Sequence, residues 1–141
     1  MQTFVPCATY IECARSLDRL RLGKQRVECK QILLALDPEH DRRGWRNHPA
    51  VKMWRGHEGA LATYGLVMVH EWTRRGYNDH KCGPTFVEYL RRFPDTTRPR
   101  WWGSPAVHES HRSRLIDKLP DHYLPLWPDA PRGLAYVWPL P

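Results

Sequence analysis

Apolar residues recur at helical spacing along two long stretches of the chain, and both stretches are predicted to be α-helices. The first covers about residues 10–36 and carries one apolar side made of Cys13, Leu17, Leu20, Val27 and Leu34. Thr9 and Glu12 form a capping box at its start, and Asp37 followed by Pro38 ends it. Gly23 lies in the middle, where glycine costs about 1 kcal/mol relative to alanine. We therefore expect another group to pack closely against it.

The second stretch covers about residues 49–75. Pro49 suits the first helical position and Gly76 suits a left-handed stop. Its apolar stripe consists of Val51, Trp54, Leu61, Met68 and Trp72. A short helix is expected over residues 85–92, and a third main helix from Ser104-Pro105 to about residue 119.

The last part of the chain, residues 121–141, contains five prolines together with Tyr123, Trp127, Tyr136 and Trp138. Such a segment cannot be a regular helix, yet its rings are too many for a free tail. We expect it to pack across the helices. No stretch favours β-strands, so the predicted fold is all-α: one small domain, residues 1–141, of three main helices and this C-terminal segment.

The chain is basic: it has 141 residues, with 22 Lys and Arg against 15 Asp and Glu, a formal charge of +7. Arg makes up 17 of those 22 cations, beside seven Trp, six Tyr and three Phe. Arg grips phosphate with a planar fork and stacks on rings, so nucleic acid is the simplest partner. The alternative is a proteome that uses Arg in place of Lys throughout.

Other features of the sequence limit the class of protein. No apolar run approaches the roughly 18 residues that span a bilayer, and the first residues lack the pattern of a signal peptide. We expect a cytoplasmic monomer without membrane contact. The four cysteines match no zinc spacing and are expected to be buried small hydrophobes. No metal and no cofactor are expected.

Candidate chemistry begins on the first helix, where helical spacing puts Asp18, Arg21 and Gln25 on one face. Glu28 lies one turn further on, beside Arg21. An acid beside an Arg on a helix is often a surface ion pair that contributes little to the free energy of unfolding. The alternative is an acid inside a basic DNA-binding face, placed to activate water or to stabilise a sugar cation.

Two further clusters suit DNA binding. At the start of the second helix, Arg46, Asn47 and His48 offer polar groups to phosphate, and Trp45 can stack on a base or wedge into a duplex. On the third helix, His111, Arg114 and Lys118 share one face, which suits phosphate oxygens. A helix cap with a buried Trp, and a solvated helix face, are the corresponding structural interpretations.

Several blocks of the sequence resemble the pyrimidine-dimer DNA glycosylase family. They are Leu17-Asp18, Arg21 to Glu28, Trp45, Asn47 to Val51, Glu71 to Asn78, Arg114 to Lys118 and Pro120 to Tyr123, and they occur in the family's order. The resemblance implies a small all-α fold that kinks double-stranded DNA, flips a nucleotide and cleaves a pyrimidine's N-glycosidic bond. It also implies phosphate contacts by Arg26, Arg114 and Lys118, and a place near DNA for Tyr123 and Trp127.

The sequence departs from the family pattern at two positions that carry chemistry. The resemblance implies an attacking N-terminal threonine amine exposed by removal of Met, but residue 2 is Gln, whose large side chain should leave Met1 in place. The family's catalytic Glu falls on Gly23. We therefore expect a glycosylase that uses a carboxylate-activated water and leaves an abasic site.

Asp18 is the first candidate for this carboxylate, with Arg21 and Gln25 on its face, and Glu28 is the second. Lys24 is a candidate for an imine-forming amine if strand cleavage follows. The substrate could be a pyrimidine dimer or a hypermodified phage base, the latter implying an antiphage role. Two other functions stay open: a non-catalytic module that binds kinked or modified DNA, and a protein-interaction domain.

Overall fold

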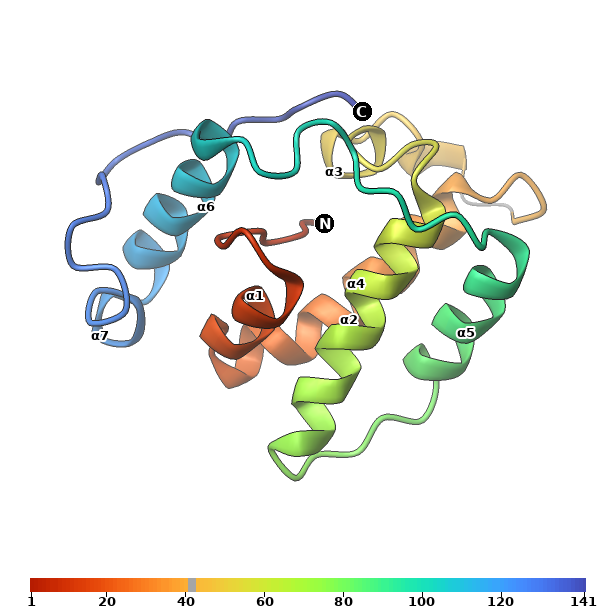
Figure 1. The fold of residues 1–141 in the computed structure, drawn as a ribbon, viewed down its shortest axis with the longest axis horizontal. Helices are drawn as coiled ribbons and strands as arrows, with labels where there is room; N and C mark the ends of the chain where they lie inside the picture. The colour runs from red at the N-terminus through yellow and green to blue at the C-terminus, as the bar shows by residue number, and fades with distance from the viewer. Residues whose placement is uncertain (41–42) are drawn as a thin grey trace.

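The computed structural model describes residues 1–40 and 43–141, which fold into helices without a strand among them (Figure 1). The α-helices are α1 (Tyr10–Ser16), α2 (Arg19–Leu36), α3 (Pro49–Lys52), α4 (Glu58–Arg74), α5 (Cys82–Arg92), α6 (Pro105–Lys118) and α7 (Pro120–Tyr123), with a 3-10 turn, η1 (Arg43–Trp45), before α3. The prediction of an all-α fold is confirmed. No helix in these ranges is long and apolar enough to cross a membrane.

Helices α2 and α4 pack side by side at the centre, with α5 against α4 at one end of the molecule and α6 and α7 at the other (Figure 1). The interior contains one continuous core, in which Trp54, Tyr64, Phe86 and Tyr123 are among the largest fully buried side chains. Gly65 of α4 permits close packing with α5, because a Cβ there would lie 2.5 Å from Cζ of Phe86.

The first predicted helix is two helices, and the expectation of one continuous helix over residues 10–36 was wrong. Leu17 adopts an extended conformation (φ −69°, ψ 135°), and Asp18 caps α2 by accepting a hydrogen bond from the Arg21 backbone N–H at 3.4 Å. Because of the break, α2 faces the core with a different side from the one predicted for a continuous helix. Leu20 and Val27 are therefore 60% and 42% exposed rather than buried. The predicted cap at Thr9 is confirmed, since its side chain accepts from the Glu12 N–H.

The second predicted helix is also divided. Helix α3 ends at Lys52, a turn with Gly56 at φ 81° follows, and α4 begins at Glu58. Pro49 is the first residue of α3 and Gly76 has the expected left-handed conformation, at φ 95°. The helical spacing of apolar residues in the sequence runs across this turn because Trp54, which lies in the turn, is fully buried.

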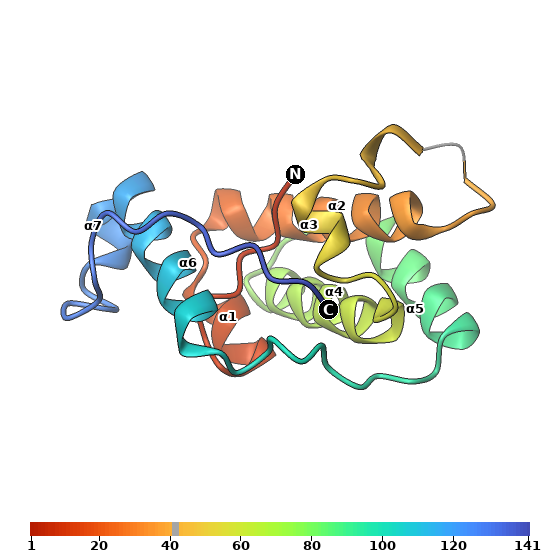
Figure 2. The same ribbon diagram turned by 90° about the horizontal axis from the view of Figure 1, so that it is seen from above.

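The C-terminal segment lies across the helices, as predicted. The Leu134 and Val137 N–H groups donate hydrogen bonds to the hydroxyl groups of Ser113 and Ser110 on α6, at 2.9 and 3.1 Å. From α6 the segment crosses the N-terminal segment and ends beside α3 (Figure 2). The N-terminal and C-terminal segments therefore cross each other, although the two ends of the chain lie apart (Figure 2).

Candidate active site

The N-terminal segment is fastened to α2 by Gln25, a fully buried side chain. Its Oε1 accepts a hydrogen bond from the Phe4 backbone N–H at 2.7 Å, and its Nε2 donates to the Gln2 carbonyl oxygen at 3.1 Å. An amide can satisfy a backbone donor and a backbone acceptor at once. Gln25 thus holds Met1 and Gln2 over the next turn of α2, which carries Glu28.

A pocket of about 360 Å³ opens where these segments meet. Its walls come from the N-terminal segment, α2, the residue before α3, the end of α6 and the C-terminal segment: Met1, Gln2, Phe4, Leu20, Arg21, Lys24, Glu28, His48, Lys118, Tyr136 and Trp138. This volume lies in the usual range for sites that hold a small ligand. The pocket combines aromatic walls with several cations.

Glu28 is the one carboxylate among the described residues that line the pocket. Burial raises its pKa above the ordinary value. The positive α-amino group of Met1, a hydrogen bond from the Gln2 backbone N–H and the charge of Lys24 lower the pKa in part but do not cancel the effect of burial. A carboxyl group with a raised pKa, set among cations in a pocket, is typical of acid–base chemistry.

A second hollow, of about 490 Å³, lies on the other side of Glu28. Leu20, Lys24 and Glu28 line both hollows and form the ridge between them. Trp72 forms part of its wall and packs on Gly23, where a Cβ would lie 3.0 Å from the ring. The close neighbour expected at Gly23 is therefore this ring, which fills the position where the family resemblance implies a Glu.

Asp18, the first candidate for the catalytic acid, lies outside both hollows and has structural partners. It accepts hydrogen bonds from the Tyr123 hydroxyl group and from Arg21, the latter at 3.2 Å. Burial by itself would raise the pKa of Asp18, but these hydrogen bonds and the Arg21 charge outweigh burial and lower it. Tyr123 is fully buried, so it supports α2 from the core rather than facing solvent.

Arg26, expected to bind phosphate, is engaged within the protein. Its guanidinium pairs with Asp79 and lies 4.4 Å from the centre of the Trp72 ring, and its side chain is 13% exposed. The geometry favours a role for Arg26 in fixing the wall of the second hollow.

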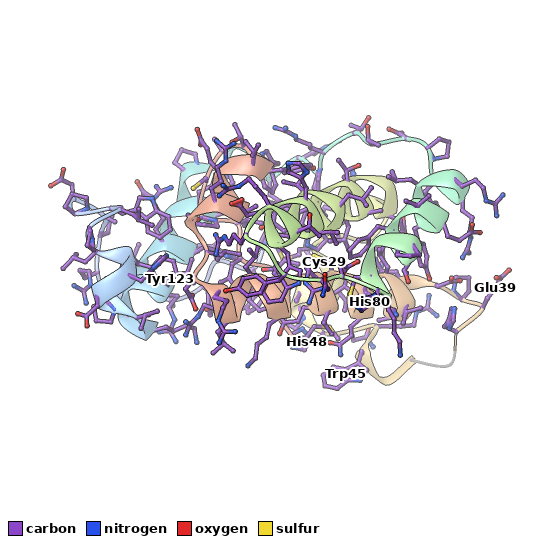
Figure 3. The ribbon with its side chains drawn as sticks, turned by 90° about the horizontal axis from the view of Figure 1, so that it is seen from below. Cys29, Glu39, Trp45, His48, His80 and Tyr123 are labelled. Atoms are coloured by element: carbon purple, nitrogen blue, oxygen red, sulfur yellow. The ribbon has the colours of Figure 1, made fainter. Side chains whose placement is uncertain are left out.

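The predicted cluster before α3 reaches the pocket through one of its residues. His48 lines the pocket, while Trp45 is 50% exposed and Arg46 and Asn47 are exposed beside it. Trp45 and His48 lie at the same edge of the molecule (Figure 3), with ring centres 6.0 Å apart. These exposed groups are free to meet a ligand that enters the pocket.

The predicted residues of the cluster on α6 lie in different environments, because one is buried in the core and another is exposed in the pocket. His111 is fully buried, and its Nδ1 accepts a hydrogen bond from the Val5 N–H at 3.1 Å. Burial lowers the pKa of His111 to about 3, so the ring is a neutral core group and not the surface phosphate contact that helical spacing suggested. Lys118 is exposed in the pocket, and the Arg114 guanidinium lies 5.1 Å from the Tyr136 ring centre.

The four cysteines are free thiols, and three of them are buried. Within residues 1–40 and 43–141, no group of three or more His, Cys, Asp or Glu side chains is placed to hold a metal ion.

Six residues of the pocket were absent from the predicted site residues: Met1, Gln2, Phe4, Leu20, Tyr136 and Trp138. Tyr136 and Trp138 belong to the C-terminal segment, whose many aromatic residues were the available signal. Met1 and Gln2 carry no local signal, because only the buried amide of Gln25 brings them over α2.

A family model described as pyrimidine dimer DNA glycosylase matches residues 1–82, which is more than half of the chain and includes Glu28, Lys24 and His48. No curated protein and no solved structure matches the chain. The matched segment supplies most of the pocket, while Lys118, Tyr136 and Trp138 lie beyond it.

Proposed function

The chain belongs to the pyrimidine dimer DNA glycosylase family, and from this premise we propose that it excises a pyrimidine from double-stranded DNA at the pocket beside Glu28. Membership of this family supports DNA glycosylase activity in general. The observation that carries the finer proposal is the placement of one carboxyl group of raised pKa in a pocket with Arg21, Lys24 and Lys118.

Binding begins with charge. The formal charge of +7 attracts the DNA backbone, and Lys24 and Lys118 at the pocket offer cations to the phosphates that flank the target nucleotide. Trp45, exposed beside the pocket, is placed to stack on a base or to fill the space that a base leaves. A base inside a duplex cannot reach a pocket of this kind, so the target nucleotide is flipped out of the stack.

The chemistry then falls to Glu28. Cleavage of an N-glycosidic bond leaves positive charge on the sugar, as in glycoside hydrolysis. The ionised Glu28 carboxylate stabilises that charge and accepts a proton from the attacking water. Glu28 takes precedence over Asp18 because Asp18 is held by Tyr123 and Arg21 outside the pocket.

The proposal is tested with duplexes that contain one thymine dimer, followed by heating in alkali to cut abasic sites. The protein is expected to break one N-glycosidic bond of the dimer, which is scored as an alkali-labile abasic site because the cyclobutane ring keeps that base joined to its neighbour; this cleavage is called base release below. Glu28→Gln is expected to retain DNA binding and lose base release. Ordinary phage DNA and phage DNA with hypermodified pyrimidines are included to identify the substrate and to test an antiphage role. Binding without release from any of these DNAs would instead support a non-catalytic module.

Borohydride trapping distinguishes the nucleophiles. A water mechanism leaves no covalent adduct, whereas attack by Lys24 or by the α-amino group of Met1, both in the pocket, forms an imine that borohydride reduces.

A further inference from the structure

The two ring nitrogens of His48 have different roles: one caps α3, and the other is available as a hydrogen-bond donor. As the residue before α3, it accepts a hydrogen bond from the Ala50 backbone N–H through Nδ1, at 3.1 Å. Because Nδ1 is an acceptor, the proton of the neutral ring must lie on Nε2. The ring therefore caps the helix with one nitrogen and offers an N–H donor with the other.

The surroundings keep this donor neutral and fixed in orientation. Burial and the positive α-amino group of Met1 lower the pKa of His48, which favours the neutral ring. The hydrogen bond from the Ala50 N–H fixes the orientation of the imidazole, and the rings of Trp45 and Trp138 lie beside it, with ring centres 6.0 and 6.2 Å away. His48 is thus a preorganised dipole in the wall of the pocket that also contains Glu28.

Resting on the proposed function, we infer that His48 stabilises the departing pyrimidine by donating its Nε2–H to the O2 atom of the base. When the C1′–N1 bond breaks, its electron pair goes to the base and is delocalised onto O2. Water supplies the hydroxyl group that bonds to C1′ and gives its proton to Glu28, and the base anion is finally protonated by Glu28 or by solvent. A donor aimed at developing negative charge is worth more than one that serves the ground state alone.

This role does not depend on the nucleophile. The base leaves with the same electron pair whether water or an amine attacks C1′, so donation to O2 assists either route. Borohydride trapping can therefore decide the nucleophile without deciding the role of His48.

The test combines a variant that keeps the cap with a substrate that lacks the acceptor. Asn also caps helices through its side-chain oxygen, so His48→Asn is expected to keep α3 while it removes the imidazole donor. The two substrates are a duplex with one thymine dimer and the same duplex with sulphur in place of O2 on the excised base. Single-turnover rates of base release are measured for parent and variant on both.

On the oxygen substrate, His48→Asn is expected to slow release by about a hundredfold, the usual effect of losing one such donor. On the sulphur substrate the same substitution should slow release by less than about fivefold, because the parent gains little from a weak acceptor. This coupling between residue and atom is what a double-mutant cycle measures. His57→Asn, at the cap of α4 and outside the pocket, is the matched control and should keep the parent rates.

Equal slowing on both substrates would assign His48 a structural role only and overturn the inference, while leaving the proposed function intact. Undiminished release by His48→Asn on the oxygen substrate would do the same. If the parent protein releases no base from any DNA in the screen, the proposed function fails, and the inference fails with it.

Discussion

The hydroxyl group of Tyr123 donates a hydrogen bond to the carboxylate of Asp18, 105 positions earlier in the chain. The backbone N–H of Asp18 in turn donates to the Tyr123 oxygen at 3.0 Å. This reciprocal pair joins α7 to the start of α2, and α2 carries both Gln25 and Glu28. The far end of the chain thus helps to set the position of the helix that forms the pocket.

Tyr123→Phe should therefore destabilise the fold. The substitution keeps the buried ring but removes a donor from the Asp18 carboxylate and the acceptor of the Asp18 backbone N–H, which costs about 1–2 kcal/mol of the free energy of unfolding. Urea denaturation measures this change. Tyr77→Phe is the control, since Tyr77 takes no part in the link, and an equal loss in both variants would contradict the assigned role of the Tyr123 hydroxyl group.

Asp18→Asn should preserve base release. Asn caps helices about as well as Asp, and the carboxylate lies outside the pocket. The pKa of Asp18 is lowered in the folded state, so its contribution to stability is present above the unfolded value of about 3.9 and is lost as pH falls through the folded value. The Asn variant should lack this part of the acid-induced loss of stability. Loss of base release with intact folding would return the catalytic role to Asp18.

Glu28→Gln should abolish activity while leaving the fold as stable as before or slightly more stable. A lost general base costs at least about a hundredfold in rate. The pKa of Glu28 is raised in the folded state, so the ionised group opposes folding as pH rises through the unfolded value of about 4.3 toward the folded one. The neutral amide removes that cost.

The pH dependence of the parent follows from the same carboxyl group. The base must be ionised to act, so single-turnover rates should rise with pH through the raised pKa of Glu28 and then level off. A rate that falls with increasing pH over this range would show that the protonated form of Glu28 acts instead.

Gln25→Leu should impair the positioning of the N-terminal segment without impairing DNA binding. Leu has a similar volume but satisfies neither the Phe4 N–H nor the Gln2 carbonyl, and burying these groups unpaired costs about 1–3 kcal/mol. The N-terminal segment should then leave the pocket, with base release reduced at least tenfold and affinity for undamaged duplex nearly unchanged. Hydrogen exchange at the Phe4 amide measures the release directly, and unchanged protection there would contradict it.

The sequence predicted those features of the fold that short-range chemistry decides. The cap at Thr9, the proline that opens α3 and the left-handed Gly76 depend only on neighbouring residues. The break at Leu17-Asp18 was not predicted because the apolar spacing of Cys13, Leu17 and Leu20 runs across it, although an Asp before a helix is also a capping signal.

The pocket depends on contacts between distant parts of the chain, which periodicity does not contain. Helical spacing alone placed Asp18, Arg21 and Gln25 on one face. In the structure Gln25 is buried under the N-terminal segment, and the Asp18 carboxylate accepts a hydrogen bond from the Tyr123 hydroxyl group. Glu28 was recognised as a candidate, but its raised pKa depends on segments that meet only in the folded chain. His111 could not be recognised as a core residue because helix spacing does not say which polar residue is buried.

Gly23→Ala provides the sharpest test of packing beside the pocket. Alanine in a helix is favoured over glycine by about 1 kcal/mol, but its Cβ would lie 3.0 Å from the Trp72 ring. That ring cannot easily move, because its Nε1–H donates to the Asn78 carbonyl oxygen at 2.9 Å and Arg26 lies over its face. Overpacking of this kind costs about 1–3 kcal/mol, so the variant should be less stable than the parent by about 1 kcal/mol.

The sign of this effect should reverse when the ring is removed. In a Trp72→Leu background the added methyl group has space, so Gly23→Ala should then increase the free energy of unfolding by about 1 kcal/mol through helix propensity alone. The four proteins form a double-mutant cycle measured by urea denaturation, with an expected coupling of about 2 kcal/mol. A coupling near zero would mean that the Trp72 ring yields to the methyl group, and that a larger side chain at position 23, including the Glu implied by the family resemblance, could be accommodated.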